Sequence, residues 1–321
     1  MKKHLRKGVI LAVLIFIGVG GFVLWNLFGK GEVTFVKANS GEGFACGYYY
    51  YIPQSVHKAQ TVYILVEPNN TGFPSEEETV FKNDAKNTAM SMKSMAEELG
   101  CILLVPTFAR PQSDELMYTH ALDRDTLQNN TGTLARVDLQ LIKMVENLRN
   151  LCAKKGLTVE PKILMDGFSA SGTFVNRFVA LHPAMVKAAV AGGVNGMPIL
   201  PLESLDGEKL IYPVGTADIE AITGTAVDLA QVVAVPQMIY MGALDDNDTL
   251  PYDDAFSQQE RDLILRVLGQ DMQLRWQTAQ QIYKAQGANA TFTTYAGTGH
   301  EVTDEIKTDK IRFLKDHMDG K

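Results

Sequence analysis

A serine lies at the centre of the segment 167–172, Gly-Phe-Ser-Ala-Ser-Gly, and this segment is well suited to nucleophilic chemistry. The apolar run 163–165 before Ser169 predicts a buried strand, and 173–181 after it has helical character. A serine on a sharp strand-to-helix turn projects its hydroxyl above the sheet, and small residues at Gly167 and Ser171 let the two backbones pass closely. An ordinary turn is the alternative, so catalysis also requires a base and an acid.

His300 is the histidine best placed to act as the base. It follows the expected last strand, 291–295, through the flexible turn Ala-Gly-Thr-Gly at 296–299. Such a turn can direct a side chain back over the sheet edge, where a general base must reach the serine hydroxyl. A histidine in a surface loop is the alternative interpretation.

The acid is expected in the loop that follows the strand 237–241. Asp245 is the first carboxylate after the glycine that opens this loop, and Asp246 and Asp248 are its rivals. A carboxylate in this position would orient the imidazole of His300 and stabilise its charged form.

The order of predicted elements indicates an α/β fold. The expected strands are 32–37, 46–52, 61–67, 101–105, 163–165, 186–191, 237–241 and 291–295; the expected helices are 87–99, 134–154, 173–181, 260–268, 274–285 and 303–317. Strands that are apolar throughout and alternate with helices predict a mostly parallel central sheet with helices on both faces. Ligands bind at the carboxyl ends of such strands, where Ser169 is expected. The domain spans 31–321. The segment 196–235 interrupts the alternation of strands and helices and is expected to be an insertion or cap.

The chain order Ser169, Asp245, His300 resembles that of the α/β-hydrolase superfamily. The segment 167–172 is similar to the family's nucleophile turn, Gly-Ala-Leu-Asp at 242–245 to its acid turn, and Gly-Thr-Gly-His at 297–300 to its histidine turn. Within the superfamily, the chain is most similar to secreted bacterial esterases of the polyester-depolymerase and feruloyl-esterase type. Ser171 replaces the glycine usual at its position.

The resemblance implies two hydrogen-bond donors for an oxyanion. One is the backbone N–H of Ala170, directly after the nucleophile. The family's His-Gly-Gly motif is absent, and the equivalent loop at 67–72 offers Asn69 and Asn70 instead.

Glu67, which opens the same loop, has the wrong charge for this site. A bare carboxylate beside a developing oxyanion would oppose catalysis. We therefore expect Glu67 to turn away, or to pair with Arg110 or Arg124 of the long loop 107–131.

The segments 107–131 and 196–235 both leave the carboxyl edge of the expected sheet. We expect them to form the walls of an acyl pocket, with His120 and Arg124 near its polar rim and Ile211 and Tyr212 supplying apolar surface. The alternative is that 196–235 merely covers a sheet edge.

The first thirty residues predict a membrane anchor. Residues 1–7 carry four basic side chains and no acidic one, and 8–28 contain no charged residue, which is long enough to span a bilayer as a helix. Basic residues stay on the cytoplasmic side, so the remainder is expected outside the cytoplasm. A cleaved signal peptide, and hence a secreted protein, is the alternative.

Charge and cysteine content exclude other classes. Of the 30 Lys and Arg residues, five lie in 1–30, whereas none of the 37 Asp and Glu residues does, so 31–321 carries a formal charge of −12. An acidic domain without a basic stripe argues against a nucleic-acid partner. Cys46, Cys101 and Cys152 are too widely spaced to indicate a metal site. We expect Cys101 and Cys152 to be small buried apolar residues, although a disulfide stays open outside the cytoplasm.

Together these features predict a membrane-anchored, extracytoplasmic serine hydrolase that cleaves small-molecule or polymeric carboxylic esters through an acyl-enzyme. No metal or organic cofactor is required for this chemistry. An acyltransferase would use the same three residues with another acceptor, and a catalytically silent binding protein on this fold is the second alternative.

Overall fold

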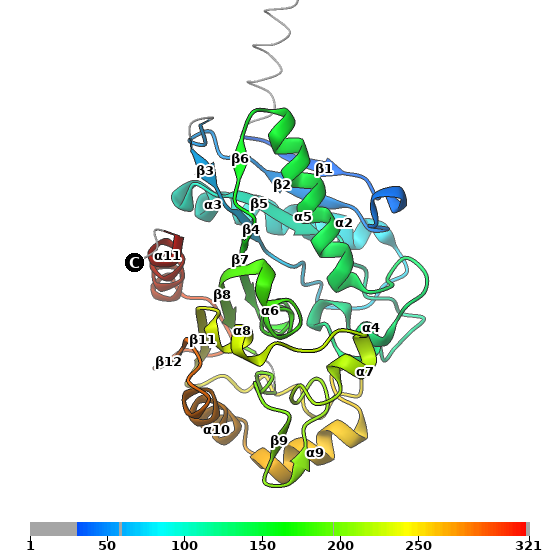
Figure 1. Cartoon of the computed structure of the whole chain (residues 1–321), viewed down its shortest axis with the longest axis vertical. Coiled ribbons are helices and arrows are strands. Elements are labelled where there is room, and N and C mark those ends of the chain that lie inside the picture. Colours follow the sequence, from blue (N-terminus) through cyan, green and yellow to red (C-terminus); the bar gives the residue numbers. More distant parts are fainter. Residues whose placement is uncertain (1–30, 58–59, 195, 319–321) are drawn as a thin grey trace, which may run out of the picture.

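An eight-stranded sheet forms the centre of the molecule in the computed structural model, which describes residues 31–57, 60–194 and 196–318 (Figure 1). Its strands are β1 (Val33–Val36), β2 (Tyr48–Tyr51), β4 (Ile64–Val66), β5 (Ile102–Pro106), β7 (Ile163–Phe168), β8 (Val186–Gly192), β11 (Gln237–Gly242) and β12 (Ala290–Tyr295). Their spatial order is β1-β2-β5-β4-β7-β8-β11-β12. The strands from β5 to β12 are mutually parallel, and β2 joins β1 and β5 antiparallel. The predicted mostly parallel sheet is confirmed.

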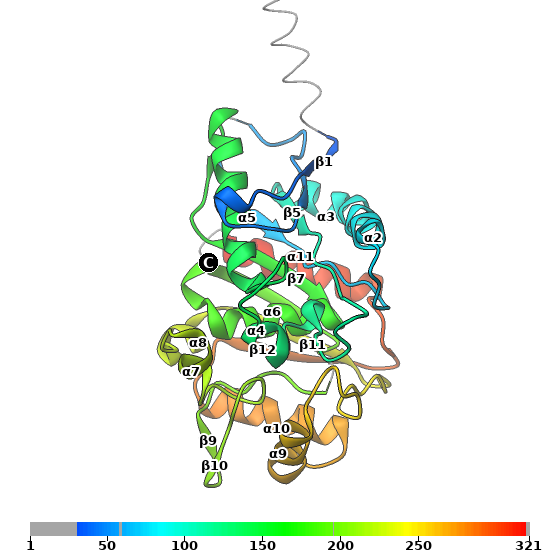
Figure 2. The same ribbon diagram turned by 90° about the vertical axis from the view of Figure 1, so that its right-hand side faces the viewer.

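Two layers of helices cover this sheet. The main helices are α2 (Glu78–Ser91), α3 (Lys93–Leu99), α5 (Val137–Lys154), α6 (Ala170–Leu181), α9 (Gln258–Leu268), α10 (Met272–Ala285) and α11 (Asp304–Met318). Residues of α5, α6 and α10 share one apolar core with the sheet, and residues of α2, α3 and α11 share the other. Figure 2 shows α5 and α2 on opposite sides of the strands.

Periodic apolar residues explain why α5 forms and how it packs. Leu141, Met144 and Leu148 follow at steps of three and four residues, and each is completely buried. Three- and four-residue steps place side chains on one face of a helix, so this face lies on the sheet, while Lys143, Glu146 and Lys154 are exposed.

The region of the expected helix 87–99 differs from the prediction. The structure begins α2 nine residues earlier, at Glu78, and separates it from α3 at Met92. The first half of α2 is polar, and only Phe81, Ala85 and Ala89 of this helix are buried. So thin an apolar stripe gives little periodic signal in the sequence.

The insertion 196–235 is built from short elements. These are the hairpin strands β9 (Ser204–Leu205) and β10 (Glu208–Lys209) and the helices α7 (Ile219–Thr223) and α8 (Leu229–Ala234). Its residues share an apolar cluster with α9 and α10, of which Leu200, Leu210 and Val214 are fully buried members. The hairpin, α9 and α10 lie at the β12 end of the molecule, below the sheet in Figure 1.

The predicted membrane anchor, 8–28, lies outside the described residues. Within 31–57, 60–194 and 196–318, no helix combines the length and the apolar character needed to cross a bilayer. The three cysteines are free thiols; Cys101 and Cys152 are buried, as predicted, and burial raises the pKa of each to about 12.

Candidate active site

Ser169 occupies a strained turn between β7 and α6. Its backbone has φ 63° and ψ −126°, a conformation that residues other than glycine rarely adopt and that is found where the surrounding structure imposes it. The Ser169 N–H donates to Gly192 O of the neighbouring strand β8 at 2.9 Å, and Thr173 N–H donates to Ser169 O at 2.9 Å. The serine is thus held by both the sheet and the helix that it connects.

Close backbone contact explains the small residues around Ser169. A Cβ atom at Gly167 would lie 2.4 Å from the backbone oxygen of Ser171, so no larger residue fits there. The Ser171 hydroxyl is buried and donates to Phe168 O at 2.9 Å. Serine therefore satisfies its own polar group at the position where the family usually has glycine.

His300 and Asp245 meet at the same edge of the sheet, after β12 and β11. The Nδ1 atom of His300 lies 2.8 Å from Oδ2 of Asp245. Burial would raise the pKa of Asp245, but hydrogen bonds from His300 and from the Asn247 N–H together outweigh it and hold this pKa below its usual range. Because an ionised carboxylate only accepts, Nδ1 carries the proton and Nε2 is left as the basic atom.

The two rival carboxylates have other surroundings. Asp246 is exposed, and Asp248 forms an ion pair with the buried guanidinium of Arg275, whose Nη2 lies 2.5 Å from Oδ2. Geometry therefore places Asp245, and neither rival, against His300.

Asn247 contacts the opposite side of the same imidazole, a feature that the sequence analysis missed. Its Nδ2 atom lies 3.0 Å from His300 Nε2. The ring of Phe168 packs against the imidazole with 4.6 Å between centroids. Gly193, at φ 52°, leaves room for both rings, since a Cβ there would lie 2.9 Å from His300 Cε1.

The two expected asparagines have different places. Asn69 is fully buried, and its amide bridges to the backbone of Phe108: Nδ2 donates to the carbonyl at 2.8 Å and Oδ1 accepts from the N–H at 3.1 Å. Asn70 is half-buried and donates from Nδ2 to Phe168 O at 3.3 Å, directly beside Ser169. Ala170 is the first residue of α6, where a backbone N–H has no partner within the helix.

His120 lies inside the protein and holds the loop that contains these asparagines. Its Nδ1 accepts from Thr71 N–H at 3.3 Å, so Nε2 carries the proton and donates to Phe108 O at 2.9 Å. Burial lowers the pKa of His120 to about 4, which keeps the ring neutral. With 1% of its surface exposed, His120 is a loop-fixing residue and does not form the pocket rim that we expected.

Arg124, Ile211 and Tyr212 also differ from the expected pocket wall. Arg124 donates to Tyr212 O at 2.6 Å and pairs with Asp218 at 2.6 Å, which ties the loop 107–131 to the insertion. Tyr212 is completely buried and donates its hydroxyl to Leu122 O, and Ile211 packs against the core of the insertion. The two segments do meet, through a half-buried ion pair and a buried hydrogen bond.

Glu67 has neither of the arginine partners that we considered. Arg110 pairs with Asp254, and Glu67 instead points into the sheet interior, where it faces Asp166 of β7, near Lys310 of α11. Burial and then the Asp166 carboxylate raise the pKa of Glu67 well above its ordinary value, which Lys310 only partly opposes. This shift favours the uncharged carboxyl of Glu67 and so weakens the unfavourable charge that its position suggested.

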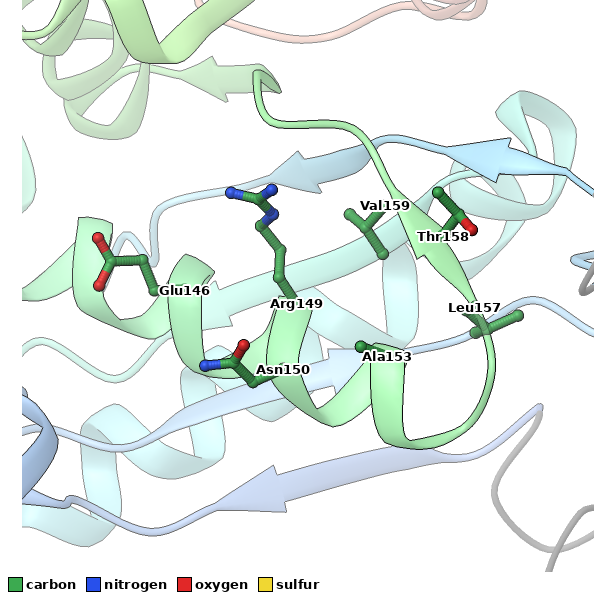
Figure 3. Close-up of a pocket in the computed structure, with 7 residues that line it drawn as sticks. All are labelled: Glu146, Arg149, Asn150, Ala153, Leu157, Thr158 and Val159. Carbon is green, nitrogen blue, oxygen red and sulfur yellow. The ribbon is translucent and has the colours of Figure 1, made fainter.

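One hollow of the structure lies away from this site. It is a trough of about 550 Å³ beside α5 and the short strand β6 (Thr158–Val159), shown in Figure 3. Its lining residues are Glu146, Arg149, Asn150, Ala153, Leu157, Thr158 and Val159. Because β6 precedes β7, the trough lies toward the amino end of that strand, opposite to Ser169.

Similarity to known proteins is visible in structure and not in sequence. Neither a protein-family model nor a curated protein matches this sequence. The structure is similar to poly(aspartic acid) hydrolase-1 from Sphingomonas sp. KT-1, with a TM-score of 0.59 and 18% identity over 89% of this chain and 98% of that one. It is also similar to a poly(3-hydroxybutyrate) depolymerase from Bordetella parapertussis, with a TM-score of 0.58 and 17% identity over 92% of each chain. These likenesses establish the α/β-hydrolase fold.

Proposed function

We propose that this protein is a serine hydrolase that cleaves carboxylic esters through an acyl-enzyme. The observation that carries the proposal is the 2.8 Å contact between His300 and Asp245 at the sheet edge where Ser169 occupies its strained turn. Nucleophile, base and acid follow β7, β12 and β11, so the parallel sheet brings three distant segments to one edge.

Each residue has a defined chemical role in this reaction. His300 Nε2 takes the proton of the Ser169 hydroxyl as Oγ attacks the acyl carbon, and Asp245 stabilises the resulting imidazolium. The same proton then passes to the leaving alcohol. Water next attacks the acyl-enzyme, with His300 again accepting a proton and returning it to Ser169, and the acid is released. The Ala170 N–H and the amide of Asn70 are proposed as donors to the oxyanion, and Asn69 is assigned to holding the loop.

The substrate is proposed to be a small-molecule or polymeric ester. A panel of esters graded by acyl length and polarity tests this directly, with product release followed by titration of acid. Hydrolysis of at least one ester class, lost in Ser169→Ala, is expected. Competing alcohols distinguish the acyltransferase alternative, because they would divert most of the acyl group into new esters.

The segment 1–30 is proposed to anchor the enzyme in the membrane, with the domain outside the cytoplasm. The support is the basic cluster at 1–7 followed by the uncharged run 8–28. We expect the protein to stay with membranes after a carbonate wash, and protease added to intact protoplasts to digest the domain. A soluble product that begins near Glu32 would instead indicate a cleaved signal.

A further inference from the structure

The imidazole of His300 is hydrogen-bonded at both nitrogens. Asp245 contacts Nδ1 at 2.8 Å, and the Asn247 side chain contacts Nε2 at 3.0 Å. Both partners come from one turn, in which the Asn247 backbone N–H donates to Oδ1 of Asp245 at 3.0 Å. The Asp245 carboxylate thus orients the ring through one oxygen and the Asn247 backbone through the other.

The position of the proton on His300 defines which group of the Asn247 amide faces the ring. Since Nδ1 carries the proton that it donates to Asp245, Nε2 has a lone pair and accepts. The Asn247 NH₂ group is therefore the donor. This lone pair is also the one that receives the Ser169 proton in the proposed reaction, so Asn247 occupies the reactive side of the base.

We propose that Asn247 is a positioning residue that favours the neutral, proton-accepting form of His300 and must turn away or present its oxygen when the imidazolium forms. An amide N–H stabilises a bare Nε2 and opposes a protonated one, because two donors then face each other. Asp245 acts in the opposite sense. Asn247 and Asp245 therefore act in opposite directions on His300, which must be neutral before it accepts the proton and is charged afterwards.

Two further described residues lie against the ring, and neither carries a charge. Phe168 covers one face, and Gly193 lies at Cε1. The remaining carboxylates of the turn lie elsewhere: Asp246 is exposed, and Asp248 is paired with Arg275.

Two substitutions test the inference, which rests on the proposed function for its kinetic readout but not for its spectroscopic one. Asn247→Ala removes the donor and keeps the backbone bond to Asp245. Asn247→Asp replaces the donor by a group that only accepts. Leu244→Ala is the control, since Leu244 belongs to the same turn and is 66% exposed.

The His300 titration, followed by NMR of histidine-labelled full-length protein, is the primary measurement. Loss of a donor to the neutral ring should move its midpoint to higher pH by about half a unit or more in Asn247→Ala. In Asn247→Asp the expected displacement is about one unit or more. The acid limb of kcat/KM should move in the same direction by the same amounts, and Leu244→Ala should match wild type.

Unchanged midpoints in both Asn247 variants, with the fold intact by circular dichroism, would overturn the inference. A loss of activity without any displacement of the acid limb would also count against it, because that is the signature of a purely structural residue. If wild type proved to lack esterase activity, the proposed function would fail, while the NMR titration would still decide the role of Asn247.

Discussion

The ammonium group of Lys310 in the last helix lies 2.5 Å from the carboxylate of Asp166, three residues before Ser169 in β7. Asp166 is fully buried and Lys310 is 6% exposed, so the pair connects α11 to the nucleophile strand inside the core. Glu67, which opens the loop 67–72, faces the same carboxylate. Burial raises the pKa of Tyr240 in β11, and the carboxyl groups of Asp166 and Glu67 raise it further. Four buried polar side chains thus meet beneath the site.

Lys310→Met should destabilise the protein strongly. The substitution leaves Asp166 as a buried carboxylate without its cation, which typically costs about 3 kcal/mol or more, whereas removing both charges is far less damaging. Urea unfolding of Lys310→Met and of the double variant Lys310→Met/Asp166→Asn checks this. A double variant no more stable than the single one would show that the ion pair is not the cause.

Glu67→Gln should remove a pH dependence of stability. Because the folded pKa of Glu67 is raised, this group ionises first in the unfolded chain as the pH rises above about 4.5. The free energy of unfolding of the wild type then falls by about 1.4 kcal/mol per pH unit until the pH reaches the folded pKa. The stability of the glutamine variant should therefore rise relative to wild type as the pH increases above about 4.5, measured by urea unfolding. A difference in stability that stays constant as the pH rises would contradict a raised pKa of Glu67. Glu98→Gln, at the surface, is the matched control.

His120 should make the fold sensitive to mild acid. Its folded pKa of about 4 lies below the unfolded value of 6.5, so its contribution to stability is present above pH 6.5 and is lost as pH falls toward 4. Between these two pH limits the contribution of His120 to the free energy of unfolding changes by about 3 kcal/mol. His120→Gln should flatten this part of the stability profile. Parallel profiles for the variant and wild type would place the acid sensitivity elsewhere.

These buried groups show where sequence reasoning reached its limit. Ser169, Asp245 and His300 could be predicted because each follows an expected strand in a short, recognisable turn, and parallel strands bring such turns to one edge. Nothing local to Glu67 indicates that it faces Asp166 and Lys310, since that contact requires β4, β7 and α11 to be packed first.

The same limit applies to the expected pocket. His120 and Tyr212 lie in two segments that leave the carboxyl edge of the expected sheet, and these segments do contact each other. Which side chains of an irregular segment point inward depends on tertiary contacts, and these two are buried. Asn247 was missed because its role depends on the ring that it contacts.

Asp245→Asn should be far more harmful to turnover than Asp248→Asn. The amide would leave His300 in the wrong tautomer, and the equivalent change in a serine protease lowers kcat by roughly 10⁴-fold. Asp248 instead pairs with the buried Arg275, so Asp248→Asn should chiefly lower the free energy of unfolding. Steady-state kinetics with one ester and urea unfolding of both variants separate the two effects. The reverse ranking in kcat would move the acid to Asp248.

Covalent labelling of Ser169 tests the central claim most directly. A fluorophosphonate probe forms a stable bond only with a serine whose neighbouring base removes its proton. Full-length wild type should take up one probe per chain, and the modified peptide should contain Ser169. The variant Ser169→Ala, folded as judged by circular dichroism, should take up none and hydrolyse no ester. Stoichiometric labelling of that variant at another serine, or ester hydrolysis that survives the substitution, would contradict the assignment of Ser169 as the nucleophile.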